Sequence, residues 1–174
     1  MTRPIFEEPP DDMALRAGAL LVNWNGNAGV AAPEVSSAFR VAAERLLDAA
    51  LANNETWEAA YPILFCYRHG LEVSLKSLVP AAPRQHGLAD LWATLQPRLA
   101  GQYPAGQLAW LNDRIAEFEQ VDPRSTAFRY ADAVPASRAP ELWVDFHHLK
   151  ACAASLFDAL DRLRLTGAAG GVAP

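Results

Sequence analysis

The stretch that decides the fold covers residues 61–79 and reads YPILFCYRHGLEVSLKSLV. At about 100° per residue, its large apolar side chains fall on one face of a helix. These side chains are Leu64, Tyr67, Leu71, Leu75 and Leu78. A cap at Asn54 or Thr56 can begin this helix and Pro80 can end it, while Pro62 predicts an early kink or a later start. The stretch therefore predicts one long amphipathic helix.

Helical spacing of apolar residues recurs on both sides of this stretch. The further predicted helices cover residues 13–22, 34–53, 86–99, 104–120 and 141–165. Asp122-Pro123 opens an irregular stretch that extends to about residue 140, a length at which loops are often functional. No segment alternates as a strand does. The sequence therefore predicts an all-α fold, an antiparallel bundle of four to five long helices with one long irregular loop at about 122–140.

The length of 174 residues favours a single domain with one hydrophobic core. We expect residues 13–165 to form this domain. Residues 1–12, which hold four acids and three prolines, are predicted to be an acidic flexible tail, and the Gly- and Ala-rich residues 166–174 a disordered tail. With 51% hydrophobic and 20% charged residues, the chain as a whole is of the globular class.

The charge balance limits the kinds of partner. Fifteen Lys and Arg against twenty Asp and Glu give a formal net charge of −5, which excludes a broad basic surface that coats nucleic acid through phosphate contacts. Because four acids lie in the first twelve residues, sixteen acids and fourteen bases remain over residues 13–174. A confined basic site is therefore compatible with the composition.

Compartment is predicted from what the chain lacks. Cys66 and Cys152 are too few for a disulfide framework and have no zinc-type spacing, so we interpret them as buried thiols in a reducing compartment. The acidic first residues reverse the order of a secretory signal, and no run of about 18 apolar residues occurs. The expectation is a cytoplasmic protein with no membrane contact.

Charged side chains form a second face of the 61–79 helix, within an arc of about 100°. They are Arg68, His69, Glu72 and Lys76. Glu72 and Lys76 are in the favourable i,i+4 order. One interpretation is a solvated charged stripe. The other is a covered polar pocket, because Phe65 and Val79 project into the same arc.

The stretch DPRSTAFRY at residues 122–130 is the second candidate. Arg129 lies between Phe128 and Tyr130, so aromatic anchors can fix the direction of its guanidinium. The expected partner of Arg129 is Glu72. Arg129 then either ties the loop to the bundle or, with Tyr130, borders a phosphate or nucleotide site.

Histidines give no metal site in the sequence. His147 and His148 are adjacent and diverge by about 100° on the last predicted helix, so one ion cannot easily be held by both. Asp145 and His148 can form a hydrogen-bonded pair, but no second pair of this kind occurs. Phosphate-binding glycine loops and nucleophile elbows are also missing, and no metal or cofactor is predicted.

Three short motifs follow one another along the chain. They are Arg68-His69-Gly70-Leu71-Glu72-x3-Lys76, His86-Gly87-Leu88-x2-Leu91-Trp92 and Asp122-Pro123-x-Ser125-x2-Phe128-Arg129-Tyr130. On an all-helical background over about residues 34–165, this order resembles the HEPN-like superfamily of small bacterial helical proteins. The resemblance implies a compact helical bundle, frequent homodimerisation, and association with RNA cleavage or with phage-defence and toxin–antitoxin systems.

The catalytic members of that superfamily carry an arginine followed after four to six residues by a histidine, and two such motifs meet across a dimer to cut RNA without metal. Here eight residues separate Arg138 from His147, and Arg68 and His69 are adjacent. We therefore expect a non-classical or noncatalytic member that binds RNA or another phosphate-bearing ligand at a polar pocket. Its expected residues are Arg68, His69, Glu72, Lys76, Arg129 and Tyr130.

Two alternatives remain open. The chain could be a structural or dimerising interaction module in which the same charges form a buried network. It could also be a metal-independent ribonuclease, with His69 or His147 as the weak catalytic candidates. A homodimer and an operon-encoded protein partner are the protein partners expected.

Overall fold

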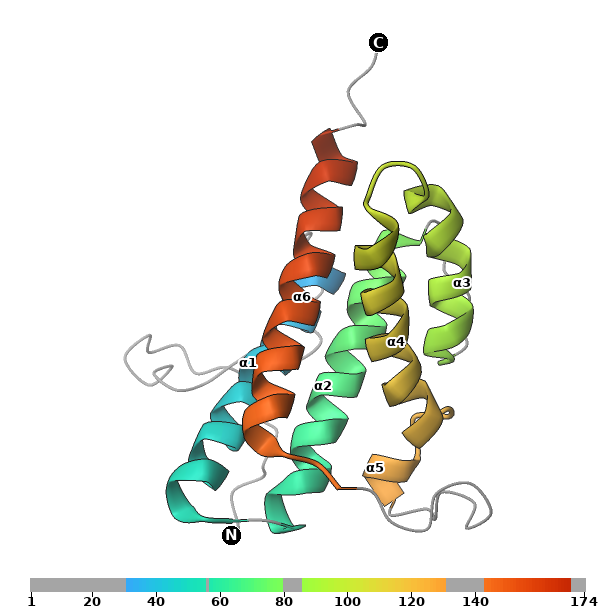
Figure 1. Cartoon of the computed structure of the whole chain (residues 1–174). Helices are drawn as coiled ribbons and strands as arrows, with labels where there is room; N and C mark the ends of the chain where they lie inside the picture. Colours follow the sequence, from blue (N-terminus) through green and yellow to red (C-terminus); the bar gives the residue numbers. More distant parts are fainter. Residues whose placement is uncertain (1–30, 56, 80–85, 131–142, 170–174) are drawn as a thin grey trace, which may run out of the picture. The chain divides into compact units, whose positions relative to one another are not determined.

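The computed structural model describes residues 31–55, 57–79, 86–130 and 143–169. Within these ranges the regular structure is helical and no strand occurs. The helices are α1 (Ala32–Asn53), α2 (Trp57–Leu78), α3 (Leu88–Leu99), α4 (Ala105–Val121), α5 (Ala127–Tyr130) and α6 (Phe146–Ala169) (Figure 1). The predicted all-α class is confirmed.

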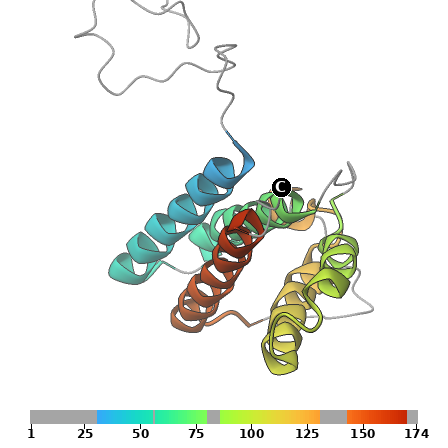
Figure 2. The ribbon, with the colours of Figure 1, turned by 90° about the horizontal axis from the view of Figure 1, so that it is seen from above.

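Helix α2 is the central element of residues 32–169, and it packs against α1, α3, α5 and α6. In Figure 2, α2 and α6 lie in the middle. Helix α1 lies on one side of them, and the α3–α4 pair lies on the other side. Its apolar face is fully buried at Ile63, Tyr67, Leu71 and Leu75. The amphipathic pattern of the sequence therefore identified the helix around which the core is built.

The directions of the helices are less regular than an antiparallel bundle requires. Helices α1 and α4 run opposite to α2, α3 and α6 (Figure 1). Helices α2 and α3 are parallel because His86, just before α3, contacts the middle of α2, whereas Arg98 near the end of α3 bonds to Leu78 at the end of α2. The described helices therefore do not all alternate in direction as in an antiparallel bundle, since α2 and the next helix, α3, run the same way.

Local sequence explains several helix boundaries. Asn54 takes the left-handed conformation, with φ of 54°, directly after the last residue of α1. Helix α2 continues through Pro62, so this proline does not delay the start of the helix. At α6, Oδ1 of Asp145 accepts hydrogen bonds from the backbone N–H groups of His147 and His148, as a helix-capping side chain does.

Two predicted irregular segments contain helix. Residues 127–130 of the expected 122–140 loop form α5, and α6 extends to Ala169, so residues 166–169 of the expected tail are helical. The predicted tail 1–12, the predicted helix 13–22 and residues 131–140 of the loop lie outside the described residues. None of the helices in the described ranges is long and apolar enough to cross a membrane.

Candidate functional site

Arg68 lies at the centre of a cluster of five polar residues, which are Arg68, Glu72, Lys76, His86 and Asp122. We call it the buried polar cluster because Arg68, Glu72 and Asp122 are buried, whereas the side chains of Lys76 and His86 are 25% and 57% exposed. The Arg68 side chain is 0% exposed, and its Nη1 donates to Oε2 of Glu72 at 2.7 Å. Its Nη2 donates to the backbone carbonyl of His86 at 2.6 Å, and its Nε to that of Asp122 at 3.0 Å. A single guanidinium thus joins α2 to the start of α3 and to the end of α4.

Glu72 is the acid that Arg68, Lys76 and His86 share. Its Oε1 accepts a hydrogen bond from Lys76 Nζ at 2.7 Å and lies 2.8 Å from Nδ1 of His86. Burial raises the pKa of Glu72, but the hydrogen bonds from Lys76 and His86 and the charges of Lys76 and Arg68 outweigh burial, so the pKa is lowered. Glu72 is therefore held as a carboxylate, with both of its oxygens in contact with nitrogen atoms of the cluster.

Asp122 connects the polar cluster to α5. Its Oδ1 accepts hydrogen bonds from the backbone N–H groups of Thr126 at 2.7 Å and Ala127 at 3.0 Å, which caps this short helix. Its Oδ2 lies 3.6 Å from Nε of Arg68 and is buried without a hydrogen-bond partner in the described part of the chain. The orientation of α5 thus depends on a carboxylate that Arg68 stabilises electrostatically.

The charged face of α2 is therefore neither a solvated stripe nor an open pocket. Arg68 and Glu72 are buried, Lys76 is 25% exposed, and both cations are paired with Glu72. The interpretation as a solvated stripe is wrong, because Arg68 and Glu72 are buried. Phe65 and Val79, which project into the same arc, correctly indicated a covered face. Arg68 and Glu72 cannot contact a ligand without breaking the cluster.

Arg129 does not pair with Glu72, and this expectation is wrong. Its Nε donates to the backbone carbonyl of Ser125, which has φ of 57°. Its guanidinium carbon lies 6.0 Å from the ring centroid of Phe65 and 5.4 Å from that of Tyr130. The buried acid is occupied by nearer cations, so Arg129 remains at the surface between two aromatic rings.

His69 belongs to the aromatic stack rather than to the polar cluster. Its ring lies 4.4 Å from that of Phe39 in an edge arrangement and 5.8 Å from that of Phe65 in a stacked one. Burial lowers the pKa of His69, as do the charges of Arg68, Arg129 and Lys76, and together they outweigh the opposite effect of Glu72. His69 is accordingly a neutral packing residue at neutral pH.

This lowered pKa predicts a pH dependence of stability. Below its ordinary pKa of 6.5, the unfolded chain binds a proton at His69 that the folded chain binds only at lower pH. The free energy of unfolding should therefore fall between about pH 7.5 and pH 5.5, and His69→Phe should make this fall smaller. Urea denaturation at the two pH values measures it. His147→Phe, at an exposed position, should leave the fall unchanged, and an equal fall in wild type and His69→Phe would contradict the prediction.

The histidines of α6 lie apart from the polar cluster. His147 and His148 are exposed, and Nε2 of His148 is 3.4 Å from Sγ of Cys152 on the next turn. No arginine of the described ranges is recorded in contact with either ring. Across these ranges no three metal-binding side chains come together. The structure thus brings together Arg68, Glu72 and Lys76, and separately His69, Arg129 and Tyr130, but neither set with His147.

His86 and Asp122 were missed as members of the cluster. Sequence reasoning placed His86 at the start of a predicted helix and Asp122 at the start of the irregular stretch, and it assigned neither to the charged face of the 61–79 helix. His86 begins the second short motif and Asp122 begins the third. Each lies at a helix boundary, and in the folded chain both contact Arg68 in the middle of α2. Polar residues next to a predicted helix end are the signal that could have found them.

Compared with protein-family models, curated proteins and solved structures, the chain matches none of them.

Proposed function

We propose that this chain is a noncatalytic, HEPN-like helical module that binds single-stranded RNA on the surface of α5 and the neighbouring part of α2. The observation that carries the proposal is the guanidinium of Arg129, held between the rings of Phe65 and Tyr130 without a carboxylate partner among the described residues. Tyr130 is 66% exposed. An exposed ring beside an arginine offers a base a stacking surface and a phosphate a cation.

We call the residues Tyr61, Phe65, Arg129 and Tyr130 the α5 surface. Tyr61 is 47% exposed, and its ring lies 6.5 Å from that of Phe128, a buried residue of α5. The exposed ring of Tyr130 lies beside the arginine, and Tyr61 adds a second exposed ring on the neighbouring part of α2, as in proteins that bind single strands through stacked bases. The surface is small, in keeping with the exclusion of a broad basic face.

The buried polar cluster has a supporting role in this proposal. Asp122 caps α5 and Arg68 holds Asp122, so the direction of Arg129 is set from within the core. Arg68, Glu72 and Lys76, which sequence reasoning placed at the ligand, are thus positioning residues. His69 contributes by packing against Phe65.

RNA binding is tested with a fluorescein-labelled single strand of about 12 nucleotides, matching the site sizes of small binding modules. In EDTA at low salt, fluorescence anisotropy should show saturable binding. Arg129→Ala and Tyr130→Ala should each weaken it about tenfold, because stacking or a phosphate contact contributes about 1–3 kcal/mol. Arg162→Ala, which removes an exposed arginine of α6, is the matched control and should change binding little. Equal weakening by Arg162→Ala, or no saturable binding, would refute the proposal.

The same samples test metal-independent cleavage. Labelled RNA incubated with wild type, His69→Ala and His147→Ala in EDTA should stay intact, because the ring of His69 is packed against Phe39 and Phe65 and no cation of the described residues pairs with His147. Cleavage by wild type that one histidine variant abolishes would make the chain a ribonuclease and identify that residue.

A dimerising interaction module is the second candidate, and the observation that favours it is Trp143, which is 93% exposed directly before α6. A large exposed aromatic side chain is typical of interface anchors. The expected partner is a second copy of the chain. Sedimentation velocity should then show a dimer that Trp143→Ser weakens. A cytoplasmic role in defence, with a partner from the same operon, would follow from the family resemblance.

A further inference from the structure

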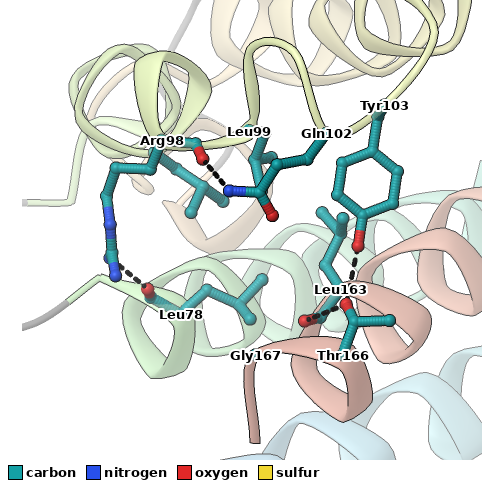
Figure 3. A pocket seen from close by; sticks show the side chains of 9 residues that line it. Leu78, Arg98, Leu99, Gln102, Tyr103, Leu163, Thr166 and Gly167 are labelled. Carbon is teal, nitrogen blue, oxygen red and sulfur yellow. Dashed lines mark hydrogen bonds between the residues drawn. The ribbon is translucent and has the colours of Figure 1, made fainter. Parts of the chain in front are cut away.

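A hollow lies at the end of α2, α3 and α6, far along α2 from the α5 surface. It has a volume of about 210 Å³. Its lining residues come from α2, α3, the α3–α4 turn and α6 (Figure 3). They are Leu78, Leu95, Arg98, Leu99, Gln102, Tyr103, Leu163, Thr166 and Gly167.

The floor of this hollow is apolar and its rim is polar. Leu95, Leu99 and Leu163 are buried, with 3%, 9% and 6% exposure, and form an apolar base. Arg98 and Gln102 are exposed on the rim. This division into an apolar base and a polar rim suits a ligand with an apolar tail and a polar head.

The hydrogen bonds within the rim show which of its donors remain available to the polar head of a ligand. Thr166 donates its hydroxyl proton to backbone carbonyls of α6, so the contact of 2.6 Å between Tyr103 and Thr166 has Tyr103 as donor. Gln102 spends an amide proton on the carbonyl of Arg98. The hydroxyl protons of Tyr103 and Thr166 are thus both donated within the protein, and the guanidinium of Arg98 is the strong donor that remains for a ligand.

Arg98 is the charged side chain among the lining residues. One of its five N–H groups donates from Nη1 to the carbonyl of Leu78 at 3.2 Å, which anchors the guanidinium at the C-terminal end of α2. No ion pair joins it to an acid in the described ranges. Its unspent donors can therefore form a paired contact with a carboxylate, the group that guanidinium geometry matches best.

We propose that this hollow binds a small aliphatic monocarboxylate, with the carboxylate at Arg98 and the chain along Leu95, Leu99 and Leu163. The volume of about 210 Å³ lies below the roughly 300–1,000 Å³ of drug-like sites, so it suits a small ligand with a medium-length chain. This inference is independent of the proposed RNA binding, because none of its residues belongs to the α5 surface.

Sodium octanoate is the probe, titrated into the ¹⁵N-labelled full chain at constant ionic strength. Amide signals of Gln102, Tyr103, Thr166 and Gly167 should shift and saturate. Octanol, with the same chain and no charge, and butyrate, with the charge and a short chain, should each bind about tenfold more weakly or less. Shifts spread over the whole core, or equal binding of octanol, would overturn the proposal.

Variants separate the charge from the cavity. Arg98→Gln should weaken octanoate about tenfold and leave octanol unchanged, since it removes the charged hydrogen bonds alone. Thr166→Trp, an exposed position, should fill the mouth and abolish the binding of both. Arg162→Gln removes an arginine of α6 that does not line the hollow, and it should alter neither. Octanoate binding unchanged in Arg98→Gln, or in a folded Thr166→Trp protein, would refute the site.

Discussion

Replacing Arg68 by methionine should lower the free energy of unfolding by about 3–5 kcal/mol, the cost of breaking a buried ion pair by removing one partner. Methionine fills much of the space but donates no hydrogen bond. The carbonyls of His86 and Asp122 lose their donor, and the buried carboxylate of Asp122 loses its cation. Glu72 keeps Lys76 and His86, so the loss arises mainly at the junction of α2 with the end of α4. Urea denaturation followed by circular dichroism measures it.

Arg40 offers a matched control within the same chain. Like Arg68, it pairs with a glutamate one turn later, at 2.9 Å from Glu44, but its side chain is 21% exposed and its further partner Asp158 is 54% exposed. Solvent screens such pairs, so Arg40→Met should cost about 1 kcal/mol or less. The cost of Arg68→Met should also persist in high salt, because water and ions do not reach the pair. Equal costs for the two substitutions would show that burial of the cluster is unimportant.

The fold class could be predicted because hydrophobic periodicity acts through one helix at a time. Leu71 and Leu75 repeat along α2 at helical spacing, and burial of that stripe needs no knowledge of what covers it. Two of the differences, α5 and the end of α6, are short segments that lie near proline or glycine residues. There local propensity is weak and tertiary packing decides, as the burial of Phe128 in α5 illustrates.

The candidate site could be predicted in part, because sequence spacing places residues on one helix but not the partners that other helices supply. Arg68, Glu72 and Lys76 share a face of α2, which the i,i+4 rule alone requires. His86 and Asp122 reach the same point from other elements, and their arrival leaves no acid for Arg129. A buried acid pairs with the cations that the chain fold brings nearest, and that choice is not written in any local motif.

Gly70→Val should be the second strongly destabilising substitution, with an expected loss of about 3 kcal/mol. A Cβ at Gly70 would lie 3.2 Å from the backbone oxygen of Ser36 and 3.2 Å from Cζ of Phe157. The phenyl ring can shift, but the carbonyl is fixed in α1, whose Ser36 hydroxyl also donates to the carbonyl of Gly70 at 2.8 Å. Two further methyl groups would therefore force α1 and α2 apart and expose the core between them.

Gly106→Val separates this close contact from the general effect of placing valine in a helix. Gly106 is in α4, and a Cβ built there meets nothing within 4 Å. Valine and glycine differ by less than about 0.5 kcal/mol in helix propensity, so the control should change stability little. Thermal unfolding of both variants under one condition compares them. A loss for Gly70→Val no larger than that for Gly106→Val would mean that α1 and α2 can separate freely, and the close approach at Gly70 would then contribute nothing to the stability of the bundle.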